Sequence, residues 1–208
     1  MTVSDEEYWP KKTDKAFKSD GNRDTNVWYG WLQKFNMQEM IADSFKEVAD
    51  MAVNGVELGP RPNTLDGFLH PIAYLYRHYI ELKLKNVLRG GIRLGEITVS
   101  NDIMHGHSLH KLWNCFRQLV VKMQMGNDLA PLDNTERIVM QFHDMDRSGQ
   151  AFRYTTDRDG KPFLEKLPEN VGLMHLRDVM AKVHRLLNGC EMCMGAAIDA
   201  ADEAASYY

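Results

Sequence analysis

The stretch "YLYRHYIELKLKNVL", residues 74–88, places five Arg, His, Glu and Lys side chains in a segment that otherwise has the pattern of a buried helix. At about 100° per residue, Arg77, His78, Glu81 and Lys85 fall within one sector that is about 100° wide. Apolar residues occupy most of the remaining circumference, whereas a surface helix normally has only an apolar stripe. The pattern therefore predicts a central helix that contacts neighbours on several sides.

These four residues, here called the polar strip, allow two interpretations. In the first, Arg77–Glu81 and Glu81–Lys85 are solvated i,i+4 ion pairs, each contributing a few tenths of a kcal/mol. In the second, the polar strip lines a binding site or the seam of a dimer. A metal site at His78 and Glu81 is disfavoured, because no second pair of ligands is evident in the sequence. Lys83 interrupts the apolar side of the same helix.

The composition indicates a globular chain without a membrane segment. The 208 residues are 44% hydrophobic and 26% charged, with a net charge of −4, so bulk electrostatic attraction gives no support for nucleic-acid binding. The sequence has no apolar run of about 18 residues, and its acidic N-terminus does not resemble a signal peptide. Three cysteines fit a reducing compartment, so we expect a cytoplasmic protein; no cofactor and no metal are implied.

The remaining pattern predicts a single helical domain over residues 27–208, preceded by a flexible arm over 1–26. The fold class expected is an all-α, up-and-down bundle of about five helices with short links. Turn-forming residues near 146–165 predict an irregular or hairpin insertion. The predicted helices cover residues 27–54, 68–89 with Gly90 and Gly91 as its stop, 108–125 with Ser108 as N-cap, 134–142 with Asn134 or Thr135 as N-cap, and 171–187, which continues toward the C-terminus after a break.

Three segments resemble elements of HEPN domains, and they occur in the order that the family shows, over about residues 68–190. They are "AYLYRHYIELKLKNVL", "HGHSLHKLW" and "AFRYTTD". The last resembles an R-Y-P-D element at Arg153, Tyr154 and Asp157, but it lacks the proline. HEPN domains are small helical bundles, commonly dimeric. Many are metal-independent ribonucleases of toxin, antiphage defence and CRISPR-linked systems, and others are non-catalytic binding or regulatory modules.

The resemblance implies a candidate ribonuclease motif, in which an Arg is followed after four to six residues by a His. "RDVMAKVH" places Arg177 and His184 about 20° apart on one helix face, and we expect Arg77 and His78 to assist. An imidazole can move the proton of a 2′-hydroxyl, and a guanidinium can stabilise the charge that develops on the phosphate. A second match, "RIVMQFH", fits poorly, because its Arg and His lie about 120° apart. In the alternative interpretation, His184 caps the edge of the core.

Two other hypotheses involve no catalysis. A non-catalytic HEPN-like module would bind a protein, nucleotide or RNA through the polar strip together with His107, Arg147 and Arg153. A structural subunit would use its helices only for assembly. In either case we expect a homodimer or a subunit of a larger protein complex, because a central helix with a polar strip suggests a shared surface.

Arg147 and Arg153 flank "SGQAF" and carry a prediction about the loop before the last helix. We expect both to fold back toward the helix of residues 68–89 and to pair with acidic groups such as Glu81 or Asp146. An isolated buried carboxylate at Glu81 would be costly, so a cation nearby is required.

Overall fold

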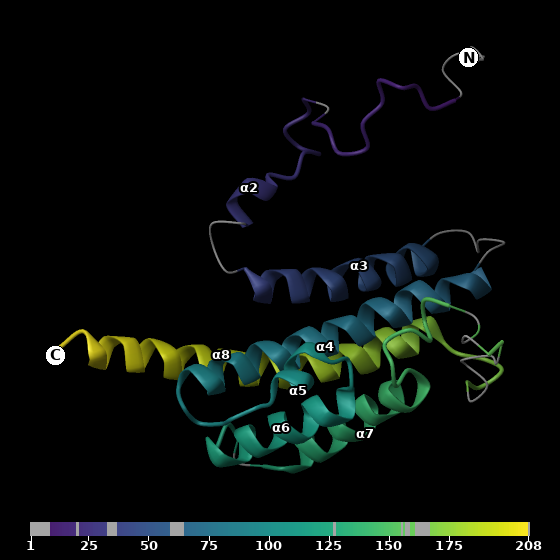
Figure 1. Cartoon of the computed structure of the whole chain (residues 1–208). Helices are drawn as coiled ribbons and strands as arrows, with labels where there is room; N and C mark the ends of the chain where they lie inside the picture. Colours follow the sequence, from purple (N-terminus) through teal and green to yellow (C-terminus); the bar gives the residue numbers. More distant parts are fainter. Residues whose placement is uncertain are drawn as a thin grey trace. The chain divides into compact units, whose positions relative to one another are not determined.

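The computed structural model describes residues 9–19, 21–32, 37–58, 65–126, 128–154, 156, 159–160 and 167–207. The chain divides into two units, Met1–Met37 and Gln38–Tyr208. The first contains α2 (Tyr29–Leu32), and all the other elements lie in the second. The described part of the chain forms helices and no strand, so the predicted all-α fold is confirmed (Figure 1).

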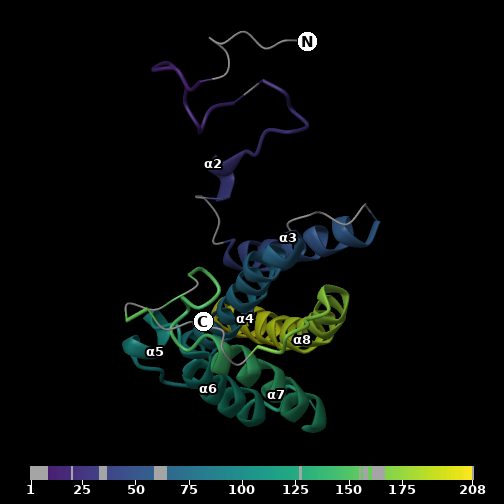
Figure 2. The ribbon, with the colours of Figure 1, turned by 90° about the vertical axis from the view of Figure 1, so that its right-hand side faces the viewer.

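The second unit is a bundle of five long helices. They are α3 (Gln38–Leu58), α4 (Leu69–Arg93), α6 (Leu109–Lys122), α7 (Ala130–Met145) and α8 (Leu173–Ala205), with the short η1 (Leu65–Phe68) before α4 and α5 (Asn101–His105) before α6. In both views α4 lies between α3 and the pair formed by α6 and α7, with α8 alongside it (Figures 1 and 2). The prediction that this helix is central is confirmed. None of the described helices combines the length and the apolar character needed to cross a bilayer.

The direction of each helix follows from which residues meet. Tyr79 and Arg93 of α4 contact His184 and Asp202 of α8 in that order, so the two helices run in the same direction. The link between α4 and α6 leads the chain back along the bundle, so α6 also runs parallel to α4. α3 and α7 run in the opposite direction.

The core forms where the apolar sides of α4, α6 and α8 meet. Tyr76 and Tyr79 of α4 and Trp113 of α6 are fully buried, as is Met180 of α8. Because α4 contacts three helices, its side chains are buried around most of its circumference, including the charged ones. Arg77, Glu81 and Lys85 of the polar strip are therefore enclosed within the bundle.

The predicted helix stop at Gly90 and Gly91 was wrong, because both residues lie inside α4. A Cβ atom on Gly90 would lie 2.3 Å from Cγ of Met194, and one on Gly91 would lie 2.5 Å from Cδ2 of Leu119. The two glycines therefore let α8 and α6 approach α4 closely. The helix ends at Arg93. Gly95, two residues later, has a φ of +71° and takes part in a Schellman motif with the last turn of α4.

Several other predicted boundaries moved. The segment predicted as one helix over 27–54 contains α2 and α3, with residues 33–36 outside the described part. α7 begins before its predicted caps, because Pro131 occupies its first turn and the backbone N–H of Ala130 donates to Asp128. Ser108 caps α6 as predicted, accepting a hydrogen bond from the backbone N–H of Lys111. α8 continues without a break.

The insertion predicted near 146–165 is described only in part. Residues 146–154 are irregular, and residues 155, 157–158 and 161–166 lie outside the described residues, so the match proposed at Asp157 does too.

Substitution by alanine should have opposite effects at Gly91, which packs against another helix, and at Gly189, which does not. Gly91→Ala should lower the free energy of unfolding by about 1–3 kcal/mol, because buried Leu119 has to move. Gly189→Ala in α8 meets no atom within 4 Å, so it should raise that free energy by about 0.5–1 kcal/mol through helix propensity. Urea unfolding of both variants measures this, and stabilisation by Gly91→Ala would contradict the packing.

Candidate functional site

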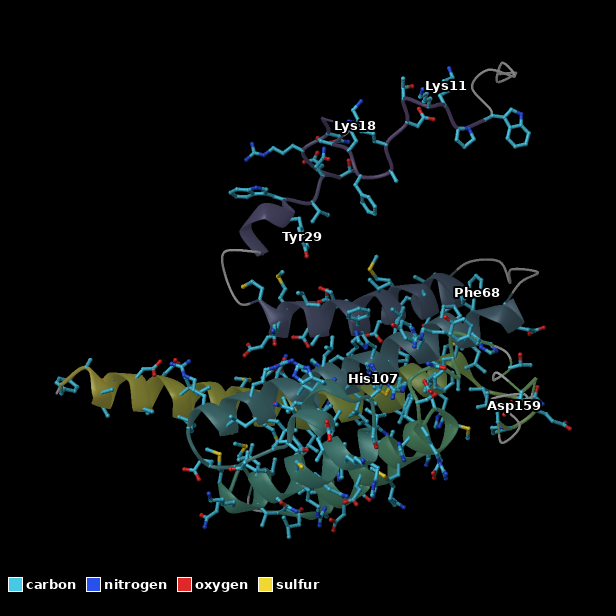
Figure 3. All side chains as sticks on the ribbon, in the orientation of Figure 1. Lys11, Lys18, Tyr29, Phe68, His107 and Asp159 are labelled. Carbon is cyan, nitrogen blue, oxygen red and sulfur yellow. The ribbon has the colours of Figure 1, made fainter. Side chains whose placement is uncertain are left out.

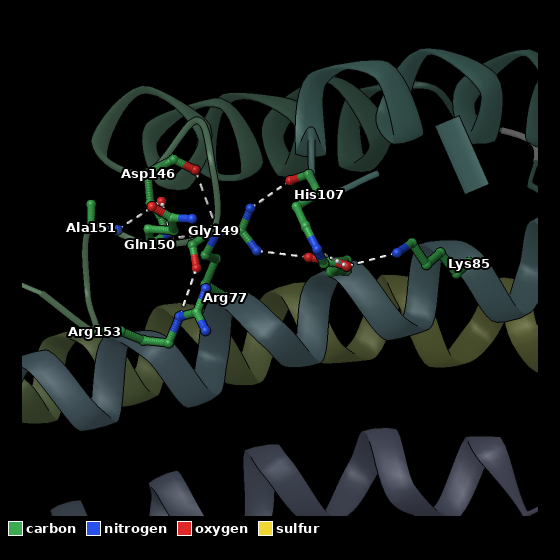
Figure 4. Close-up of polar contacts among 9 residues, drawn as sticks. Arg77, Lys85, His107, Asp146, Gly149, Gln150, Ala151 and Arg153 are labelled. Carbon is green, nitrogen blue, oxygen red and sulfur yellow. Dashed lines mark hydrogen bonds and ion pairs between the residues drawn. The ribbon is translucent and has the colours of Figure 1, made fainter. Parts of the chain in front are cut away.

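Arg77 lies at the centre of a buried group of charges on the side of α4 that faces α6 and α7. Its side chain is 2% exposed. Its Nη1 donates to Oε2 of Glu81 at 2.8 Å, and its Nη2 donates to the backbone carbonyl of His107 at 2.5 Å. Its Nε lies 3.1 Å from Oδ2 of Asp146. One guanidinium thus connects α4 with the start of α6 and the end of α7 (Figure 4).

Glu81 holds the rest of this group together. Its Oε1 accepts a hydrogen bond from Nζ of Lys85 at 2.7 Å and lies 2.9 Å from Nδ1 of His107. Burial alone would raise the pKa of Glu81, but the hydrogen bonds from Lys85 and Arg77 outweigh it and lower the pKa to about 2. We call Arg77, Glu81, Lys85, His107 and Asp146 the buried charge cluster; four of them are buried, and His107 remains partly exposed.

Asp146 joins the loop after α7 to this cluster. Its Oδ1 accepts hydrogen bonds from the backbone N–H groups of Gln150 at 2.7 Å and Ala151 at 3.0 Å, which closes the loop on itself. Gly149 in that loop has a φ of +76°, and a Cβ there would lie 3.3 Å from Cβ of His107. The loop therefore fits closely against the start of α6 (Figure 4).

The prediction that Arg147 and Arg153 pair with Glu81 or Asp146 was wrong. Arg147 is exposed and lies 3.5 Å from Asp144 in the preceding turn. Arg153 donates to the backbone carbonyl of Gly149, and its guanidinium lies 5.8 Å from the ring centre of Tyr74 on α4. The loop does fold back on α4, but Arg77 pairs with both buried carboxylates and Lys85 also pairs with Glu81, so the two loop arginines are not needed there.

Three of the four residues of the polar strip are buried. The i,i+4 pairs Arg77–Glu81 and Glu81–Lys85 are present as predicted, but they are buried and not solvated. Within the chain, Arg77, Glu81 and Lys85 of the polar strip are buried, and the segment at His107 and the loop after α7 pack against Arg77. Of the cluster, His107 is the most accessible, with 59% of its side chain exposed.

The depressed pKa of Glu81 predicts how stability depends on pH. The folded pKa of about 2 lies below the ordinary 4.5, so the contribution of Glu81 is present above about pH 4.5 and is lost as the pH falls through 2. The shift corresponds to about 3 kcal/mol. Urea unfolding between pH 7 and 2 should show a flatter dependence for Glu81→Gln than for the wild type. The exposed Glu96→Gln should retain the wild-type slope, and an unchanged slope in Glu81→Gln would contradict the prediction.

Arg177 and His184 lie on α8, but each binds a different part of the chain. Arg177 donates to Oδ1 of Asn54 at 2.7 Å and to Oε2 of Glu57 at 2.5 Å, both on α3. The hydrogen bond to Glu57 raises the pKa of Arg177. Nδ1 of His184 and the hydroxyl of Tyr79 are hydrogen-bonded at 2.8 Å, and burial lowers the pKa of His184. Seven residues of helix separate the two by about 10 Å along the axis.

His78 faces α3 and not the buried charge cluster. Its ring packs edge-on against Phe45 at 4.5 Å and stacks on Tyr74 at 5.8 Å. Burial lowers its pKa. Arg77, its neighbour in sequence, contacts the segment at His107 and the loop after α7 instead, so the structure does not combine these two residues in one site.

A second group of charges was missed by the sequence analysis. Lys83 is fully buried in α4 and pairs with Glu191 of α8 and, at 2.9 Å, with Asp43 of α3. Burial raises the pKa of Glu191, although bonds from Lys83 and Asn86 oppose this shift. The only signal in the sequence is that Lys83 interrupts an apolar helix face. The group holds three helices together.

The described residues contain no group of three or more His, Cys, Asp or Glu side chains that could hold a metal ion. Cys115, Cys190 and Cys193 are free, and burial raises the pKa of the first two. Neither finding adds a reactive centre to the groups described above.

We compared the chain with family models, with curated proteins and with solved structures, and it matches none of them. The resemblance to HEPN domains therefore rests on the three sequence segments, and a function has to be argued from the geometry of the two charged groups, the α8 residues and the exposed surface.

Proposed function

We propose that the chain is a non-catalytic, HEPN-like binding and assembly module that functions within a protein complex. The three segments that resemble HEPN domains support this, because they contact one another. Oε1 of Glu81 in the first segment lies 2.9 Å from Nδ1 of His107 in the second. The guanidinium of Arg153 in the third segment lies 5.8 Å from the ring centre of Tyr74 in the first. Three free cysteines suit a reducing compartment such as the cytoplasm.

The observation that carries the proposal is that the candidate catalytic groups are bound within the chain. Arg177 is held by Glu57 and lies 3.1 Å from Asp178, so two carboxylates surround the guanidinium that would have to bind a phosphate. A phosphate would meet repulsion from both. Arg77 is buried behind three oxygen acceptors, so it is not accessible to a nucleic acid.

A second candidate function is a metal-independent endoribonuclease of a toxin or antiphage defence system. One observation favours it. The lowered pKa of His184 keeps its imidazole neutral near pH 7, which is the form that a general base requires. In this function Arg177 would leave Glu57 to bind the phosphate, and RNA would be the substrate.

RNA cleavage distinguishes the two candidates. The wild-type chain and the double variant Arg177→Ala/His184→Ala are incubated with end-labelled RNA, with and without EDTA, at several pH values. We expect both proteins to leave the RNA intact. Cleavage that persists in EDTA, weakens below about pH 6 and is lost in the double variant would contradict the proposal and establish the second candidate. Arg185→Ala, a charge change on the same helix, is the matched control.

A further inference from the structure

α3 exposes apolar residues on a side that does not face the core. One side of the helix is buried through Ala42, Ala49 and Val53, each 0% exposed. The rest of the circumference of a surface helix is normally polar. On α3, however, a second stripe of larger side chains faces outward. Figure 3 shows sulfur-containing side chains on the side of α3 away from α4. The stripe, here called the α3 seam, consists of Ile41, Ser44, Val48, Met51, Gly55 and Leu58.

The α3 seam is exposed along most of the helix. Ile41, Val48, Met51 and Leu58 are 40%, 52%, 70% and 88% exposed. The steps between successive seam residues alternate between three and four, which is the spacing of the a and d positions of a coiled coil. The spacing of the seam residues is the same whether it is counted from Ile41 or from Leu58. The small residues Ser44 and Gly55 each come second from one end of the seam.

We propose that the α3 seam is the contact between two copies of this chain, packed antiparallel about a two-fold axis between Val48 and Met51. In this register Val48 of each copy meets Met51 of the other, and Ile41 meets Leu58. The small residues Ser44 and Gly55 also meet, which lets the helices approach closely. The inference rests on the proposed function, because it identifies a second copy of this chain as the partner of the assembly module.

The charges of α3 favour a second copy over a basic partner. Asp43 is paired with Lys83, and Glu57 with Arg177, both within the same chain. Asp50 is similarly engaged by Lys46 and Tyr76. The charged side chain that borders the α3 seam is Glu47, and in the antiparallel register it lies opposite Ala52, so no like charges meet. The dipoles of the two helices also oppose each other.

Sedimentation equilibrium of the full chain tests this directly. The wild type should be a dimer at micromolar concentration. Met51→Glu places a charge in the centre of the seam twice per dimer, so it should raise the dissociation constant by at least about 100-fold. Met192→Glu on α8 is the matched control, because Met192 is 69% exposed, and it should leave the dimer intact. Circular dichroism confirms that both variants fold.

Cross-linking tests the register. In a chain whose exposed Cys193 is replaced by Ser, Ile41→Cys and Leu58→Cys proteins should be joined by a short bis-maleimide when mixed, and not when each is treated alone. A wild type that stays monomeric at all concentrations overturns the proposal, as does a dimer that Met51→Glu leaves unchanged. Cross-links of Ile41→Cys with itself overturn the antiparallel arrangement. RNA cleavage and sedimentation are independent readouts, so failure of the seam and failure of the proposed function can be told apart.

Discussion

Arg77→Met should lower the free energy of unfolding by about 3–5 kcal/mol, the range for breaking a buried ion pair. The side chain is 2% exposed, and its loss leaves the carboxylates of Glu81 and Asp146 without their shared cation. Lys85 still binds Glu81, whereas Asp146 keeps only the two backbone N–H groups of its own loop. Urea unfolding at pH 7 measures the loss.

Arg147→Met is the matched control, because this arginine is 70% exposed and only borders Asp144. Its substitution should change stability by less than about 0.5 kcal/mol. If Arg77→Met cost no more than Arg147→Met, the buried charge cluster would not hold the fold together.

Lys83→Met should cost about 3 kcal/mol for a related reason. Lys83 is fully buried, and its removal leaves Glu191, which is only 8% exposed, with Asn86 as its remaining partner. Asp43 is 35% exposed and can be hydrated, so most of the penalty should come from Glu191. Thermal and urea unfolding give the size of the effect.

Removing the second charge tests this explanation. The double variant Lys83→Met/Glu191→Gln should recover most of the stability lost in Lys83→Met, because no buried carboxylate is left unpaired. Lys122→Met, which disrupts an exposed pair with Glu96, should have little effect by itself. A double variant no more stable than Lys83→Met would show that the loss comes from packing and not from charge.

The sequence predicted those features that depend on neighbours along the chain. The central position of α4 follows from its apolar circumference, and the pairs Arg77–Glu81 and Glu81–Lys85 follow from i,i+4 spacing. Ser108 was a correct cap because capping is decided within one turn of helix.

The features that it did not predict depend on contacts between distant segments. Asp146 lies 69 residues from Arg77, and Glu57 lies 120 residues from Arg177. No local pattern selects these partners, so the loop arginines were assigned to carboxylates that Arg77 already binds. Gly90 was read as a helix stop because the close approach of Met194, which requires a glycine there, is visible only in the packed bundle.

The charged residues of α4 bind the chain to itself, above all where Arg77 joins the loop after α7 through Asp146. The coupling free energy between Arg77 and Asp146 tests this most directly. It is obtained by urea unfolding of the wild type, Arg77→Met, Asp146→Asn and the double variant. We predict a coupling of at least about 1.5 kcal/mol, within the range for contacting residues. If the free-energy losses of the two single variants sum to that of the double variant within about 0.3 kcal/mol, the two residues are independent, which would contradict the account.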